Sequence, residues 1–199
     1  MKSTAAFLIL ISMSFHSLRA NTAGSDSTEH HSFLPSIAHA QFAGFIGMFC
    51  AGAGYHYAHN KLSASLLYGY VPKEYATNPI HTLALKNSAN IIHLRSMNTL
   101  QPILYGGFSI NCELSKHAFI TLPDYYPTGY YSRQAIHATL FIGTRLYIPL
   151  HPQKEKSCAI EPFAEIGSLD TYLWYYISHE SVDADDIFRA ALGLNFIFR

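Results

Sequence analysis

Residues 188–199 decide the fold and read Phe-Arg-Ala-Ala-Leu-Gly-Leu-Asn-Phe-Ile-Phe-Arg. Apolar side chains occupy every second position, namely Phe188, Ala190, Leu192, Leu194, Phe196 and Phe198. The alternate positions are Arg189, Ala191, Gly193, Asn195, Ile197 and Arg199. A period of two is typical of a β-strand with one apolar face. The stretch is also long enough for a tilted strand to cross a membrane.

The same period recurs along the chain. It is clearest in residues 100–111 and 136–148, and weaker in 45–58, 62–71, 81–86 and 159–167. Turn signals separate these segments at residues 58–61, 71–79, 88–98 and 149–157, and a long connection covers 113–133. We predict an all-β protein, a closed antiparallel up-and-down transmembrane β-barrel of eight strands. This count requires a further strand within residues 34–42, and loop or short helix at 169–178.

The N-terminus has the features of an export signal. Lys2 precedes an apolar run over residues 5–15, and a small residue, Ala20, stands at a suitable cleavage position. The run would span about half of a ~30 Å hydrocarbon core, which argues against a helical anchor. We therefore predict three segments: 1–20 as a signal peptide, 21–36 as a flexible polar leader and 37–199 as the barrel domain.

Composition supports a lipid-facing surface. Charged residues are 13% of the chain and aromatic residues 14%, including 14 Tyr. The formal net charge is zero, so nothing points to nucleic acid as a partner. No long apolar helix is evident, and a protein that crosses a membrane without helices must close its sheet into a barrel. Outer-membrane lipid is the expected partner.

The end of the chain resembles the terminal β-signal of bacterial outer-membrane proteins. The resemblance lies in Gly193, Phe196 and Phe198, a glycine followed by aromatic residues at alternating positions. It implies recognition by the barrel assembly machinery and location in the outer membrane of a Gram-negative bacterium. Residues 67–72 and 159–167 further resemble uncharacterised barrels of Bacteroidetes-type bacteria. That resemblance implies a fold and a location but no activity.

Four charged residues fall on the face that alternation assigns to the barrel interior: Arg145, Glu161, Glu165 and Arg189. They could line a pore. Eight strands, however, leave an interior that side chains fill, so we favour a network of paired charges inside a closed lumen.

The pairing of these charges depends on strand register. If the hairpin closes with Pro149 opposite Ser157, Arg145 lies directly opposite Glu161 on the same face. Glu165 is then free to meet Arg189 of the last strand. The sequence therefore predicts two ion pairs in the lumen.

The sequence evidence for catalytic or metal sites is weaker than that for the interior charges. Ser132 and His137 lie where the long loop meets a strand, and His179 and Ser181 offer a second Ser–His combination, but chance pairs are expected in a chain with 12 His. The histidines that invite a metal interpretation lack regular spacing: His30, His31, His56 and His59. We predict no catalytic residues, no metal and no cofactor.

Two further features stay open. A cluster in the long loop could form an aromatic girdle or a ligand-binding loop, and comprises Tyr125, Tyr126, Tyr130 and Tyr131. Cys50, Cys112 and Cys158 lack metal-binding spacing, and an oxidising compartment would allow one disulfide among them.

The leading hypothesis is a non-enzymatic outer-membrane barrel with a structural or surface-interaction role and an unknown surface ligand. One alternative is an enzyme that modifies lipid A or phospholipid. Another is a secreted, soluble, lipocalin-like carrier of a small ligand. The polarity of the two strand faces separates the first from the last, because a soluble carrier needs apolar residues inside and polar residues outside.

Overall fold

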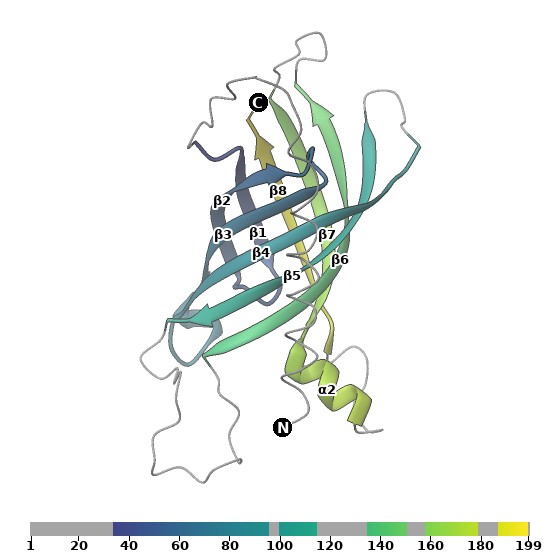
Figure 1. Ribbon diagram of the computed structural model, residues 1–199. Helices are drawn as coiled ribbons and strands as arrows, with labels where there is room; N and C mark the ends of the chain where they lie inside the picture. Colours follow the sequence, from purple (N-terminus) through teal and green to yellow (C-terminus); the bar gives the residue numbers. More distant parts are fainter. Residues whose placement is uncertain (1–33, 96–99, 115–134, 151–157, 179–186, 199) are drawn as a thin grey trace, which may run out of the picture. The chain divides into compact units, whose positions relative to one another are not determined.

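The computed structural model describes residues 34–95, 100–114, 135–150, 158–178 and 187–198. It consists of a closed barrel of eight antiparallel strands joined in sequence order, so the predicted all-β up-and-down barrel is confirmed (Figure 1). The strands are β1 (Ile37–Ala43), β2 (Phe49–Tyr57), β3 (Leu62–Val71), β4 (Ile80–His93), β5 (Gln101–Glu113), β6 (Ile136–Pro149), β7 (Ala159–Leu169) and β8 (Arg189–Ile197). A 3-10 helix, η1 (Lys73–Tyr75), follows β3, and helix α2 (Asp170–Ser178) follows β7.

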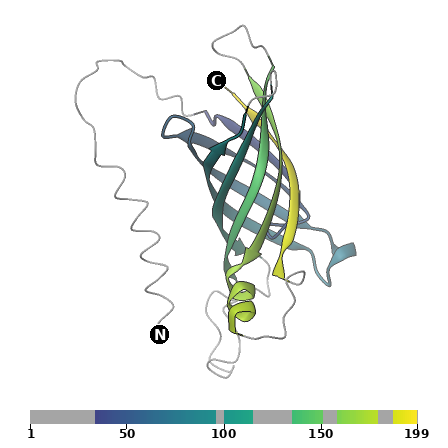
Figure 2. The same cartoon turned by 90° about the vertical axis from the view of Figure 1, so that its right-hand side faces the viewer.

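Closure occurs between the first and last strands. Residues Ile37 to Ala43 of β1 pair with β8, with Ile37 opposite Ile197 and Ala43 opposite Ala191. The strands are tilted relative to the long axis of the barrel, as Figure 2 shows. Closure leaves no unpaired sheet edge, which satisfies the backbone hydrogen bonds of every strand.

The connections differ between the two ends of the barrel. The connections at residues 58–61, 94–100 and 150–158 lie at the end where β8 finishes. The connections at the other end include the longest two, residues 114–135 and 170–188, and α2 lies there (Figure 1). We call these the turn end and the loop end. The predicted extra strand and short helix are confirmed as β1 and α2.

Two boundaries correct the sequence analysis. Residues 88–93 were expected in a turn but continue β4, where Ser88 and Ala89 pair with glycines of β5 and an irregularity follows Asn90. Residues 45–48 were expected in a strand but form the β1–β2 connection. Small and polar residues weaken the strand pattern at 88–90, whereas residues 45–48 are mostly apolar and resemble the start of a strand, so the pattern alone misplaced these boundaries.

The two faces of the sheet differ sharply in polarity. The inner face carries buried polar residues such as His39, Ser65 and Asn111 together with aromatic residues. The outer face carries exposed large hydrophobic residues, among them Leu66, Leu140 and Leu192. The described residues include no helix long and apolar enough to cross a membrane.

Candidate functional site

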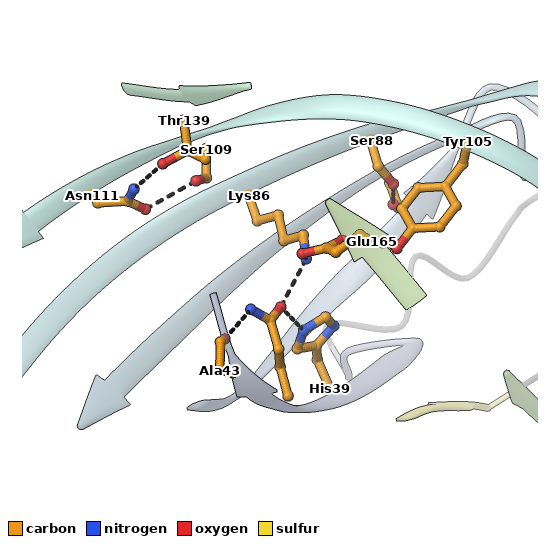
Figure 3. A network of polar contacts seen from close by, with 11 residues as sticks. His39, Ala43, Lys86, Ser88, Tyr105, Ser109, Asn111, Thr139 and Glu165 are labelled. Atoms are coloured by element: carbon orange, nitrogen blue, oxygen red, sulfur yellow. Dashed lines mark hydrogen bonds and ion pairs between the residues drawn. The ribbon is translucent and has the colours of Figure 1, made fainter. Parts of the chain in front are cut away.

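A buried ion pair crosses the middle of the lumen. The Lys86 ammonium lies 2.6 Å from a Glu165 carboxylate oxygen, and the two side chains are only 6% and 7% exposed. Tyr105 donates a hydrogen bond of 2.8 Å to the other carboxylate oxygen, and Lys86 donates a bond of 2.9 Å to Gln41 (Figure 3). Both charges thus have additional hydrogen-bond partners, which a buried ion pair requires for stability.

Aromatic rings enclose this pair. The Lys86 Nζ atom lies 4.7 Å from the ring centroid of Phe141 and 5.1 Å from that of Phe163. Tyr105 packs edge-on against both phenylalanine rings. The rings lower the local dielectric and supply cation–π attraction, so they strengthen the electrostatic contacts they surround.

A second charge cluster lies nearer the turn end. An Arg145 guanidinium nitrogen lies 3.7 Å from the Glu161 carboxylate, and both side chains are 5% exposed. Asn195 donates a hydrogen bond of 3.4 Å to Glu161, and Arg145 donates one to Asn90. The guanidinium also lies 4.4 Å from the ring centroid of Tyr105, which therefore connects the two clusters.

Polar contacts continue toward the loop end. Ser109 donates a hydrogen bond of 3.0 Å to Asn111, and Asn111 donates one of 2.8 Å to Thr139 (Figure 3). Gln41 donates to the Ala43 carbonyl at 3.1 Å, where the β1–β2 connection begins. The lumen is therefore filled by side chains that bind one another.

The structure brings together only some of the predicted interior charges. Arg145 and Glu161 meet, although the predicted register is wrong by one side-chain pair, because Arg145 lies opposite Phe163 and Pro149 opposite Ala159. A shift of two residues keeps the same face inward, so Glu161 is the diagonal neighbour of Arg145. A long arginine side chain reaches that position.

The predicted contact between Glu165 and Arg189 is wrong. Glu165 binds Lys86 and Tyr105, whereas Arg189 lies opposite Gly167 at the loop end and is exposed. The sequence analysis missed Lys86, although a signal was present. Lys86 shares a strand face with Thr82 and Ala84, opposite the outward Leu83 and Leu85, and that alternation marks it as an inward charge.

The residues of the terminal motif take different positions. Phe196 and Phe198 point outward and are exposed. Gly193 faces inward, where a Cβ atom would come within 2.2 Å of the Phe163 ring. The motif thus combines an outer aromatic row with an inner glycine that leaves room for a core ring.

Of the candidate catalytic and metal-binding residues, the structure describes only His56, His59 and His137. His56 and His59 both line a cavity at the turn end, but the described part of the chain holds no group of three or more His, Cys, Asp or Glu side chains suited to a metal ion. All three cysteines are described, and each is a free thiol.

Several predicted residues lie outside the described ranges: His30, His31, Tyr125, Tyr126, Tyr130, Tyr131, Ser132, His179 and Ser181. The proposed signal peptide and residues 21–33 of the leader do so as well.

A cavity opens at each end of the lumen. The loop-end cavity has a volume of about 490 Å³ and includes Phe45, Val71 and Arg189 in its lining. The turn-end cavity has a volume of about 310 Å³ and is lined mainly by polar residues, Arg145 and Glu161 among them. The two charge clusters lie between these mouths.

Fold and interior together define the class of protein: an eight-stranded up-and-down β-barrel with an inward-facing charge network. In comparisons with models of known families, with curated proteins and with solved structures, the chain matches none.

Proposed function

We propose that this protein is an integral outer-membrane β-barrel of a Gram-negative bacterium, without enzymatic activity, that has a structural or surface-interaction role. The single observation that carries the proposal is the placement of charge in the eight strands. Their Lys, Arg, Asp and Glu residues all line the lumen or one of its mouths: Lys86, Glu113, Arg145, Glu161, Glu165 and Arg189.

The outer surface complements this arrangement. Exposed large hydrophobic residues occur on β1, β2, β3, β4, β6, β7 and β8, and their side chains include Phe42, Leu85, Ile142, Ile166 and Leu192. Soluble monomers rarely expose contiguous apolar surface of this extent. A soluble carrier would show the opposite distribution, with an apolar interior. A lipid environment accounts for both faces.

Connection lengths supply the orientation. Outer-membrane barrels have short periplasmic turns and longer extracellular loops. The turn end, where β8 finishes, therefore faces the periplasm, and the loop end with α2 faces outside. In this orientation, the predicted assembly signal, which includes the outward Phe196 and Phe198, lies at the periplasmic end of the barrel. Outer-membrane lipid and the assembly machinery are the partners this proposal requires.

An arginine placed on the outer surface tests membrane insertion. Ile142 is 49% exposed in the middle of β6, so Ile142→Arg puts a charge near the middle of the hydrocarbon core of the membrane. We expect a loss of about 2–4 kcal/mol in unfolding free energy measured in lipid vesicles. The matched control, Tyr75→Arg, lies in η1 at the loop end and should change stability little. Equal stability of both variants, with recovery from the soluble fraction, would contradict the proposal.

The absence of enzymatic activity has its own test. Purified protein incubated with lipid A and phospholipid should release no fatty acid, and His137→Ala should behave identically. Fatty-acid release that disappears in His137→Ala would overturn this part of the proposal and favour the lipid-modifying alternative.

A further inference from the structure

The cavity at the loop end has a floor made by the chain itself. Residues 44–48, which join β1 to β2, turn into the barrel through positive φ angles at Ala43 (64°) and Gly44 (89°). Ile46 is buried in a cluster with Cys50, Leu67 and Ala84. Gly44, Phe45 and Ile46 also line a smaller internal cavity beside Lys86 and Glu165, so the connection lies between the loop-end cavity and the charge network, and we call the loop-end cavity the cup.

The surface of this cup is mostly apolar. The floor presents Phe45, Ile46 and Met48, while the wall adds Val71, Ile80 and Leu169. Phe45 also packs edge-on against Tyr172 of α2, with ring centroids 6.0 Å apart, so an aromatic pair borders the floor. A volume of about 490 Å³ and an apolar lining are typical of small-molecule sites.

Among the described residues, one arginine lines the wall of the cup. Arg189 projects from the start of β8 and is exposed, and its cross-strand neighbour on β7 is Gly167, which offers no side chain to bind it. Within the described ranges, no carboxylate lies at ion-pair distance from Arg189. Glu113, the acidic residue of the lining, belongs to β5 and forms no ion pair with Arg189.

We propose that the cup binds an amphipathic organic anion. The apolar body of the ligand packs on the floor, and its anionic group pairs with the Arg189 guanidinium, whose fork of donors suits a carboxylate or phosphate. The turn-end mouth differs, since its lining is mainly polar and its arginine, Arg145, is already paired with Glu161. This inference goes beyond the proposed function and does not depend on membrane location, because binding is measured on detergent-purified protein.

The experiment titrates the full-length protein in deuterated detergent with 4-phenylbutyrate, a soluble anion with an aromatic body. Binding is followed by saturation-transfer NMR, with protein-free micelles as the blank. We expect saturable binding by the unmodified protein. The neutral amide of the same probe should bind about tenfold more weakly, the ratio expected for loss of one charge-assisted hydrogen bond.

Matched variants locate the site. Arg189→Gln should weaken binding about tenfold, and Arg189→Lys should restore part of it, because the charge is kept without the fork. Arg95→Gln removes an exposed arginine at the turn end and should leave binding unchanged. Val71→Trp should weaken binding of every probe, because the larger ring fills part of the cup.

The source of the anion is distinguished by a second probe, decanoate. Stronger Arg189-dependent binding of decanoate than of 4-phenylbutyrate indicates a lipid-derived ligand, and the reverse indicates a water-soluble aromatic one. The proposal is overturned if the unmodified protein binds neither probe. It is also overturned if the neutral amide binds as well as the anion, or if Val71→Trp leaves the affinity unchanged. The comparison of the anion with its amide and the comparison of Val71→Trp with the unmodified protein test the proposal even if Arg189→Gln does not fold.

Discussion

The Lys86 ammonium and the Glu165 carboxylate meet at 2.6 Å although β4 and β7 are not neighbouring strands. The contact joins two walls of the barrel through its interior rather than along the sheet. Gln41 of β1 and Tyr105 of β5 bind the same two groups, so four strands converge on one ion pair. This convergence makes the pair the central polar cross-link of the lumen.

Removal of the lysine should destabilise the barrel. Lys86→Met leaves the buried Glu165 carboxylate with the Tyr105 hydroxyl but no counter-charge. We expect a loss of about 3–5 kcal/mol in the free energy of unfolding, measured by urea denaturation from lipid vesicles. Lys61→Met, which removes an exposed lysine beside a turn, is the control and should change stability little.

The second charge cluster should show energetic coupling. In a double-mutant cycle of Arg145→Met and Glu161→Gln, the coupling energy should lie in the range of about 0.5–3 kcal/mol. Arg145→Met should be the costlier single change, because Arg145 also binds Asn90 and covers the Tyr105 ring. Glu113→Gln, at the other end of the barrel, serves as the control partner, and its cost should simply add to that of Arg145→Met. Additive costs for Arg145 and Glu161 would show that the pair does not interact.

A methyl group at Gly69 should displace the floor of the loop-end cup. A Cβ atom there would lie 2.1 Å from the Ile46 carbonyl oxygen, which is backbone and cannot rotate away. Gly69→Ala should therefore cost about 1–3 kcal/mol of stability through overpacking. It should also expose residues 44–48 to added protease, measured as faster cleavage there. At Gly106 the nearest contacts are the flexible end of Ile91 at 3.2 Å and the Phe141 carbonyl oxygen at 3.3 Å, so Gly106→Ala should cost less stability than Gly69→Ala and should preserve resistance.

The terminal motif should matter for assembly. Phe198→Asp puts a charge in place of an outward aromatic residue at the turn end, which we expect to lower the yield of folded, protease-resistant barrel in cells. Phe188→Asp makes the same chemical change just before β8, at its loop end, where Phe188 is 39% exposed. A similar fall in yield for both variants would show a general effect of charge on the barrel surface rather than recognition of the chain end.

Much of the fold could be predicted because alternation is a local property of the chain. Successive side chains of a strand point to opposite faces, so Leu192 and Phe196 were assigned outward, and Arg145 and Glu161 inward, from the residues alone. Residues 44–48, Gly-Phe-Ile-Gly-Met, carry no such alternation. Their structure depends on the room left by Gly69 on a different strand.

Pairing within the lumen was predicted less well because it depends on register and closure. When the register between β6 and β7 shifts by one side-chain pair, every side chain keeps its inward or outward direction, but its cross-strand partner changes. Alternation along the sequence therefore cannot detect the shift. Arg145 still reaches Glu161 diagonally because its side chain is long. The Glu165 side chain is shorter, so it contacts only the groups that closure of the barrel places next to it, Lys86 and Tyr105.

The sequence by itself determined the period and the polarity of each face, since both follow from the geometry of a single strand. Only the tertiary structure decided that Lys86 binds Glu165, 79 residues further along the chain, and that Arg189 lines an apolar cup with no ion-pair partner among the described residues. The physical reason is that strand tilt and stagger, which arise only when the barrel closes, set which inward side chains share a level of the lumen.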